Sequence, residues 1–382
     1  MSGAGLKKVM AVLTGGFAIF AMFFGAGNLI FPLEAGKLAT SSFLPSFSGL
    51  ALTGILVPLL GLIATLIYNG NYQDFFDRFG KIPAFLLILF LLLLMGPFGA
   101  LPRCLTVAFG SFSMLFPTFP LMGFSFIMTG VVFLLCLNEN QVVPLMGAVL
   151  APAKILSVGL ILFFGLLFAT TPETGTMPTT AAFEDGVSKG YQMMDLLASF
   201  FFATVIVRHF QVNFNVETNG SPFWLSLYAI LIGSGLLFAI YFALIYLGAT
   251  FSNDLGQNAP EQFLSIIAYL TLGNFGGNLV SVAIILSCLT TVVALTTVFS
   301  DYLFEHIFKK RLPRLYCLIL TCIVTFFMSN LGFSGIVSFL APILSYLYPL
   351  LIGLTLLNIT TWAWRQTRFT KLQAEKNGVS IS

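Results

Sequence analysis

Long apolar segments recur along nearly the whole chain and constrain its fold more than any other feature. A helix that crosses the hydrocarbon core of a bilayer needs about 20 mostly apolar residues. Ten segments approach or exceed this length: 9–33, 43–68, 82–110, 119–137, 142–169, 191–212, 222–250, 275–300, 314–331 and 335–358. Composition agrees, because 8% of the 382 residues are charged, against roughly 25% in soluble domains. The sequence therefore predicts an all-helical integral membrane protein with about ten transmembrane helices.

A longer polar segment, 252–274, separates the seventh and eighth apolar segments. Its apolar residues recur at helical spacing, at Phe263, Ile266, Ile267 and Leu270. This spacing indicates a short amphipathic surface helix. A plain loop is the alternative.

The lysines and arginines divide unequally between the two ends of the predicted helices. Basic residues next to membrane helices are retained on the cytoplasmic side. With the N-terminus inside, that side collects Lys7, Lys8, Arg78, Lys81, Arg208, Lys309, Lys310, Arg311, Arg314, Arg365, Arg368, Lys371 and Lys376. The outer side has Lys37 and Lys189. We therefore expect a multi-pass protein of the cytoplasmic (inner) membrane with both termini in the cytoplasm.

The first apolar segment contains the stretch FFGAGNLIFP at 23–32. Glycine costs roughly 1 kcal/mol in a helix interior, and backbone groups freed within hydrocarbon must find other partners. A break over Gly25 to Gly27 would aim carbonyls from one half-helix, and N–H groups from the other, at the membrane centre. These ends suit the two charges of a zwitterion. The alternative is a close helix-packing face, since small residues are common at membrane interfaces.

The eighth apolar segment carries SCLTTVVALTT at 287–297. Thr290 and Thr291 lie three and four residues beyond Ser287, so both hydroxyls and the Ser287 carbonyl can face one point. This arrangement of oxygens suits a hard monovalent cation. The alternative is that each threonine hydroxyl donates a hydrogen bond to a preceding carbonyl of its own helix.

Two basic residues lie inside predicted membrane helices. Lys154 is 12 residues into the fifth, about 18 Å along the axis at roughly 1.5 Å per residue. An intramembrane lysine is by default a functional hypothesis, although the ammonium can also satisfy carbonyls freed by Pro152. Arg103 lies nearer the outer surface, where we expect it to snorkel or to pair with Asp195.

Six stretches of the chain match one known family in order. They are FFGAGNLIFP, GPFGALPRCLTVAFGSF, LAPAKIL, GYQMMDLLASFFFATVIV, CLTTVVALTT and SNLGFSGIVSFLAPILSYLYP. The chain resembles the bacterial branched-chain amino acid:cation symporter family. The resemblance implies a leucine-transporter-type fold, in which ten helices form a five-plus-five inverted repeat with broken helices 1 and 6. It also implies uptake of leucine, isoleucine and valine driven by a cation gradient, usually sodium, with no cofactor besides that ion.

The family pattern divides the chain and assigns its site residues. One membrane transport domain would hold repeat A at about 9–169, repeat B at about 191–358 and a cytoplasmic tail at 359–382. The implied sodium ligands are Ala21, Phe24, Ser287, Thr290 and Thr291. The implied substrate-binding residues are Gly25, Ala26, Gly27, Asn28, Phe201, Phe202, Ala203, Thr204 and Leu295.

This chain departs from the family pattern in two places. Relatives usually have glycine where this chain has Ala203, in the part of helix 6 that is expected to unwind. Relatives also tend to continue for two further spans, whereas a polar basic tail follows Trp364 here. The oligomeric state stays open.

Other functions compete with sodium symport. Proton-coupled uptake of neutral amino acids would use Lys154 as the coupling group. A passive channel would be expected to show a charged ring or a repeated filter sequence, and the sequence has neither. An intramembrane hydrolase would need a nucleophile with a base, or metal ligands, within the membrane helices. The histidines, His209 and His306, lie at cytoplasmic helix ends and form no ligand cluster. The small net charge of +3, spread over loops and tail, excludes nucleic acid as a partner.

Overall fold

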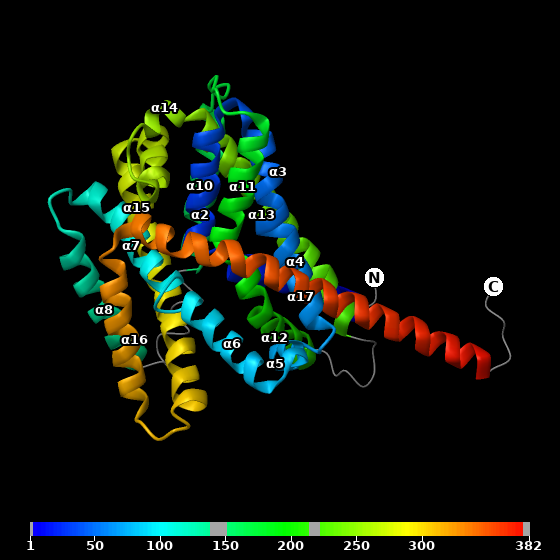
Figure 1. Ribbon diagram of the computed structural model, residues 1–382. Helices are drawn as coiled ribbons and strands as arrows, with labels where there is room; N and C mark the ends of the chain where they lie inside the picture. Colours follow the sequence, from blue (N-terminus) through cyan, green and yellow to red (C-terminus); the bar gives the residue numbers. More distant parts are fainter. Residues whose placement is uncertain (1–2, 138–150, 214–221, 377–382) are drawn as a thin grey trace.

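The computed structural model describes residues 3–137, 151–213 and 222–376. Within these ranges the chain forms helices and no strands, which confirms the all-helical prediction. The α-helices are α1 Gly3–Phe23, α2 Ala26–Ala39, α3 Phe43–Ala51, α4 Val57–Leu66, α5 Tyr72–Phe76, α6 Lys81–Met95, α7 Ala100–Leu115, α8 Leu121–Leu137, α10 Ala151–Phe168, α11 Thr179–Met193, α12 Asp195–Asn213, α13 Pro222–Thr250, α14 Ser252–Leu255, α15 Phe263–Tyr302, α16 Arg314–Ser329 and α17 Gly332–Lys376. Figure 1 shows them packed as one bundle, from which the end of α17 projects.

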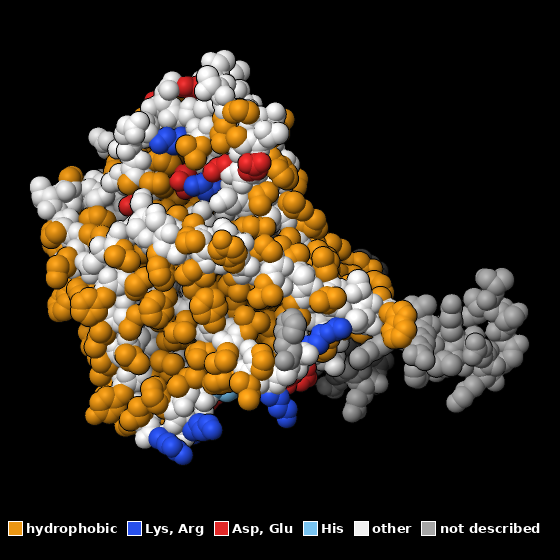
Figure 2. All heavy atoms as spheres, in the orientation of Figure 1, with side chains coloured by type: hydrophobic (Ala, Val, Ile, Leu, Met, Phe, Trp, Pro, Cys, Tyr) orange, Lys and Arg blue, Asp and Glu red, His pale blue; other side chains and the backbone are white. Residues whose placement is uncertain are grey.

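Several helical stretches are long and apolar enough to cross a membrane. In the described part of the chain these are 26–66, 81–115, 224–250, 260–307 and 332–364, with the bent pair 179–193 and 195–208 as a sixth. Shorter apolar helices occupy 8–23, 121–137, 158–168 and 314–329. Figure 2 shows hydrophobic side chains over most of the visible face, with basic side chains at its lower end and others near its top beside acidic side chains. An apolar exterior of this kind matches a lipid environment.

The first helix is broken where the sequence predicts. Helix α1 ends at Phe23 and α2 begins at Ala26. Gly25 between them is extended, with φ −94° and ψ −171°, and its N–H donates to the Phe23 carbonyl at 2.7 Å. The two halves therefore place carbonyl and N–H groups at one point inside the bundle.

The second broken helix departs from the sequence prediction in position. Helix α11 ends at Met193 and α12 begins at Asp195, with a bend of 43° between them. Met194 at the bend has left-handed backbone angles, φ 63° and ψ 20°. Helix α12 runs through Ala203 without interruption, in line with the alanine that replaces the usual glycine and weakens the expectation of unwinding there. The glycine that relatives usually have there does not mark the break in this chain.

Helix α11 itself was missed, because most of it is too polar to resemble a membrane helix. It lies beside α3 in Figure 1. The contact is made through glycines on both helices, among them Gly49 and Gly186. A Cβ atom added at Gly186 would collide with the Ser46 carbonyl, and one added at Gly49 would collide with the Phe183 carbonyl. Such backbone-to-backbone contacts need glycine, as in other membrane helix pairs.

The polar segment 252–274 contains the predicted amphipathic helix rather than a plain loop. After the short α14, helix α15 begins at Phe263 and kinks at Gly273, where φ is +68°. Phe263 and Ile267 are buried, whereas Leu270 is exposed. At the other end of the chain, α17 stays helical as far as Lys376, so the tail expected at 359–382 begins as a continuation of the last helix.

Candidate functional site

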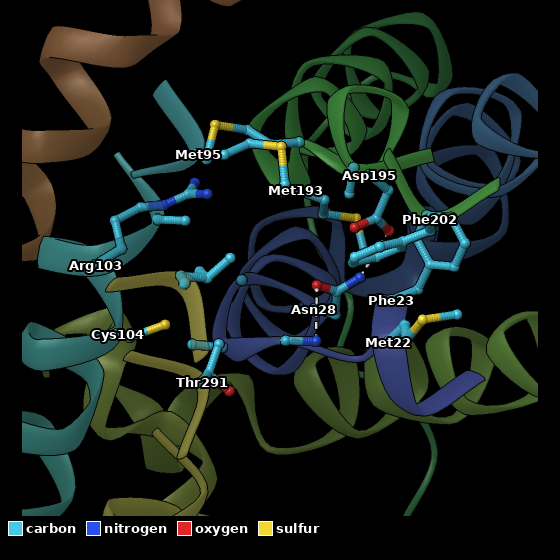
Figure 3. Close-up of a pocket in the computed structure, with 17 residues that line it drawn as sticks. Met22, Phe23, Asn28, Met95, Arg103, Cys104, Met193, Asp195, Phe202 and Thr291 are labelled. Atoms are coloured by element: carbon cyan, nitrogen blue, oxygen red, sulfur yellow. Dashed lines mark hydrogen bonds between the residues drawn. The ribbon is translucent and has the colours of Figure 1, made fainter. Parts of the chain in front are cut away.

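A cavity of about 90 Å³ lies where the two broken helices meet α6, α7 and α15. Figure 3 shows its residues converging on one space from these elements. The lining residues are Met22, Phe23, Gly25, Ala26, Gly27, Asn28, Met95, Ala100, Arg103, Cys104, Met193, Met194, Asp195, Ala198, Phe202, Thr291 and Leu295. Most of the wall is apolar, and its polar groups come from the breaks, α7 and α15.

Asn28 joins the two broken helices at the cavity wall. Its Oδ1 accepts a hydrogen bond from the Gly25 N–H at 3.3 Å. Its Nδ2 donates to Asp195 Oδ2 at 2.7 Å and also to the hydroxyl of Tyr241. The Tyr241 hydroxyl donates in turn to Asp195 Oδ2, at 3.2 Å. This closed set of bonds orients the Asp195 carboxylate and ties α2 to α12 and α13.

Arg103 does not snorkel, so that part of the sequence expectation is wrong. It interacts electrostatically with Asp195 as the other part supposed, but the two side chains form no salt bridge. The side chain is 4% exposed and lines the cavity. Its Nη1 donates to the Gln192 carbonyl at 2.5 Å, and its guanidinium lies over the Phe31 ring, 5.5 Å from the centroid. The start of α7 at Ala100 places Arg103 in the interior of the bundle instead of at a lipid-facing end.

An ion pair joins one half of each broken helix. Lys189 of α11 and Glu34 of α2 are 2.6 Å apart. The Lys189 ammonium also lies over the Phe31 ring, 6.0 Å from the centroid. Arg103 lies over the same ring, so Phe31 is near both the ion pair and Arg103.

The structure brings together most of the predicted substrate-binding residues. Those lining the cavity are Gly25, Ala26, Gly27, Asn28, Phe202 and Leu295. Three predicted residues on α12 lie elsewhere. Phe201 packs on Tyr72, with ring centroids 5.0 Å apart, and Ala203 is fully buried away from the cavity. The Thr204 hydroxyl donates to the Gly70 carbonyl at 2.5 Å. They face away because Ala198 and Phe202, four residues apart, share the side of α12 that lines the cavity, and the three residues lie on its other sides.

The predicted sodium ligands are partly assembled. Both threonine hydroxyls donate to the Ser287 carbonyl, from Thr290 at 2.7 Å and from Thr291 at 3.2 Å. Thr291 also lines the cavity. On the first helix, Phe24 is buried but Ala21 is exposed. The hydroxyls thus make the backbone bonds considered as the alternative, while their lone pairs remain able to accept a cation.

Lys154 belongs to α10, but its side chain lies outside what the structure describes. Its role as a coupling group stays a prediction. Among the described residues, no group of three or more His, Cys, Asp or Glu side chains is arranged to hold a metal ion.

Sequence reasoning missed Tyr241, which bonds Asn28 and Asp195 behind the cavity wall. It also missed several lining residues: Met22, Phe23, Met95, Ala100, Cys104, Met193, Met194 and Ala198. It considered Asp195 only as a partner for Arg103. An acidic residue within an apolar run is a signal in itself, because intramembrane carboxylates usually serve a function. No residue type marked the left-handed backbone at Met194.

Comparison with known proteins identifies the family. The sequence model of the branched-chain amino acid transport protein family matches residues 8–375. The chain belongs to this family. It is 33% identical over 372 residues to the branched-chain amino acid permease BraB of Bacillus subtilis. The alignment covers 92% of this chain and 80% of BraB. The chain is 30% identical over 364 residues to the permease BrnQ of the same organism, covering 92% and 82%. Both relatives are named as permeases and not as enzymes.

Solved structures identify the fold of this branched-chain amino acid transport protein. The crystal structure of MhsT in complex with L-phenylalanine superposes with a TM-score of 0.55 at 16% identity, over 90% of this chain and 87% of that one. A manganese transporter of Eremococcus coleocola gives 0.52 at 14% identity, over 93% and 76%. At these identities the likeness concerns the fold alone, which is that of the leucine transporter.

Proposed function

We propose that the protein is a secondary active symporter that imports leucine, isoleucine and valine together with sodium. It would act in the cytoplasmic membrane, with both termini in the cytoplasm. The observation that carries the proposal is the meeting of both broken helices at one cavity (Figure 3). Helix breaks inside a membrane bundle are tolerated where they line a site, and they offer backbone groups to a charged ligand.

The substrate class follows from the lining of the cavity and from the relatives. The wall includes Phe23, Phe202 and Leu295, which suit an aliphatic side chain. The relatives BraB and BrnQ are named as branched-chain amino acid permeases. The substrate carboxylate is proposed to lie at the first turn of α2, where the N–H groups of Ala26 and Gly27 have no partner within their helix.

Sodium is the proposed coupling ion, with Ser287, Thr290 and Thr291 as its ligands on α15. Thr291 reaches both the Ser287 carbonyl and the cavity, so an ion held there would lie near the substrate. Proton coupling through Lys154 is the competing mechanism. A passive channel is a third possibility, and it would not concentrate its substrate.

Uptake of labelled leucine into proteoliposomes, with sodium and proton gradients imposed separately, tests these alternatives. Sodium symport predicts accumulation above equilibrium under an inward sodium gradient at equal pH on both sides. Proton symport predicts accumulation under a pH gradient without sodium. Equilibration under every condition would identify a channel and would contradict both symport mechanisms.

A further inference from the structure

Two charged side chains of opposite sign are buried in the cavity wall. Arg103 of α7 is 4% exposed and Asp195 of α12 is 3% exposed. Both line the cavity, and the proposed function gives neither a role so far. Buried charges are retained in membrane helices chiefly where they serve a function, and each needs a compensating partner.

The guanidinium of Arg103 is held in place by hydrogen bonding and ring contact, but it forms no salt bridge with a described carboxylate. Its contacts are a backbone carbonyl, that of Gln192, and the ring of Phe31. Its Nε has no hydrogen-bond partner among the described residues. A carbonyl and an aromatic ring orient the cation, and the Asp195 carboxylate interacts with it electrostatically without forming a salt bridge. The planar guanidinium can still offer two parallel N–H donors to a carboxylate.

The carboxylate of Asp195 is likewise held by neutral hydrogen-bond partners. Asn28 and Tyr241 donate to its Oδ2 at 2.7 Å and 3.2 Å. Both donors are neutral, so they orient the carboxylate without cancelling its charge. No described Lys or Arg side chain forms an ion pair with it. Arg103 interacts with the carboxylate electrostatically but forms no salt bridge with it, so an ammonium group in the cavity could bind Asp195 directly.

The two charges converge on the first turn of α2. Gln192, which accepts the hydrogen bond from Arg103, is three residues before Asp195, so their Cα atoms are at most about 11 Å apart. Met193 lies between them and packs on Gly27, where an added Cβ would be 3.8 Å from the Met193 Cα. Figure 3 shows Arg103 and Asp195 on two sides of the same space, with Asn28 below.

We propose that Arg103 binds the carboxylate of the transported amino acid, beside the first N–H groups of α2, and that Asp195 binds its ammonium group. The inference rests on the proposed function, because it concerns the same cavity and substrate. The two side chains form a zwitterion clamp, that is, one cation and one anion spaced for an α-amino acid. The apolar wall then contacts only the side chain of the substrate.

The clamp predicts which leucine analogues bind. Leucinol keeps the ammonium group but lacks the carboxylate, and 4-methylpentanoate keeps the carboxylate but lacks the ammonium group. A hydrogen bond to a charged group changes affinity by about 10- to 100-fold. Wild-type protein should therefore bind leucine about 10- to 100-fold more tightly than either analogue.

Calorimetric titration of the full-length detergent-purified protein with the three ligands measures this directly. Arg103→Gln should lower the affinity for leucine about 10- to 100-fold and leave the affinity for leucinol unchanged. Asp195→Asn should lower the affinity for leucine by a similar factor and leave the affinity for 4-methylpentanoate unchanged. Arg103→Lys keeps the positive charge but lacks the planar pair of N–H donors, and it should give an intermediate affinity for leucine. Arg311→Gln and Asp254→Asn alter exposed residues and serve as charge-matched controls.

The ligand whose affinity a variant leaves unchanged is decisive. If the substituted residue had a purely structural role, the variant would bind all three ligands more weakly. Equal weakening of leucine and leucinol in Arg103→Gln would overturn the assignment of Arg103. Wild-type protein that binds 4-methylpentanoate as tightly as leucine would overturn that of Asp195, even where a variant does not fold. Failure of wild-type protein to bind leucine or valine would instead contradict the proposed function itself.

Discussion

Replacing Gly186 with alanine should loosen the contact that positions α11. A Cβ at this position would collide with the Ser46 carbonyl oxygen and would lie 2.9 Å from its carbon and 3.0 Å from the Leu50 nitrogen. All three atoms belong to the backbone of α3, so no side-chain rotation can relieve the collision. The helices would have to separate, and α11 carries Gln192 and Met193 to the cavity.

The size of the effect follows from two opposing contributions. Alanine favours the helix over glycine by about 1 kcal/mol, whereas overpacking costs typically about 1–3 kcal/mol. Gly130→Ala is the matched control, because an added Cβ at Gly130 in α8 meets no atom within 4 Å. Both variants share the gain in helix propensity. The difference between them therefore isolates the collision, and we expect it to reach about 3 kcal/mol.

Thermal unfolding in detergent, followed by size-exclusion chromatography, measures the stability of the two variants, and leucine uptake measures function. Gly186→Ala should unfold at a lower temperature than wild type and take up less leucine. Gly130→Ala should match or exceed wild type in both assays. Equal stability and uptake in the two variants would refute the close contact between α3 and α11.

Four further predictions concern the cavity. Gly27→Val should abolish leucine uptake with the protein still inserted, since its side chain would crowd the first turn of α2; normal uptake would exclude the carboxylate from this place. Excess valine should inhibit labelled leucine uptake, because an apolar pocket separates one methylene by only about 1–3 kcal/mol; failure to compete would contradict the substrate class. Changing Thr290 and Thr291 together to alanine should raise the sodium concentration for half-maximal uptake, and an unchanged value would remove them from the ion site. Tyr241→Phe removes one donor from Asp195 and should destabilise the protein by about 1–3 kcal/mol, which thermal unfolding would detect or refute.

Features that depend on a local stretch of sequence could be predicted. The break between Phe23 and Ala26 was predicted from two glycines and an asparagine within an apolar run. The helix that begins at Phe263 was predicted from apolar spacing. Both signals are local, because helix propensity and amphipathic periodicity act over a few consecutive residues.

The second break had no such signal. Glycine and proline are the residues that indicate a break in a helix from sequence. The residue with left-handed backbone angles here is Met194, a residue type that gives no such indication. A methionine adopts them here because contacts on both sides fix α11 against α3 and α12 against α4. The break therefore lies nine positions before Ala203, and of the four residues expected on α12 Phe202 lines the cavity.

The sequence by itself determined that this chain is an all-helical membrane protein with a broken first helix, because hydropathy and backbone propensity are properties of short segments. Only the tertiary structure decided what surrounds each charge. Arg103 and Asp195 are 92 positions apart in the chain, and each occurs in an apolar segment where snorkelling or mutual pairing was the simplest expectation. Burial beside the two helix breaks leaves them unpaired with each other and directed at one cavity. The electrostatic role of a charged residue depends on its neighbours in space, and these are set by packing between distant segments.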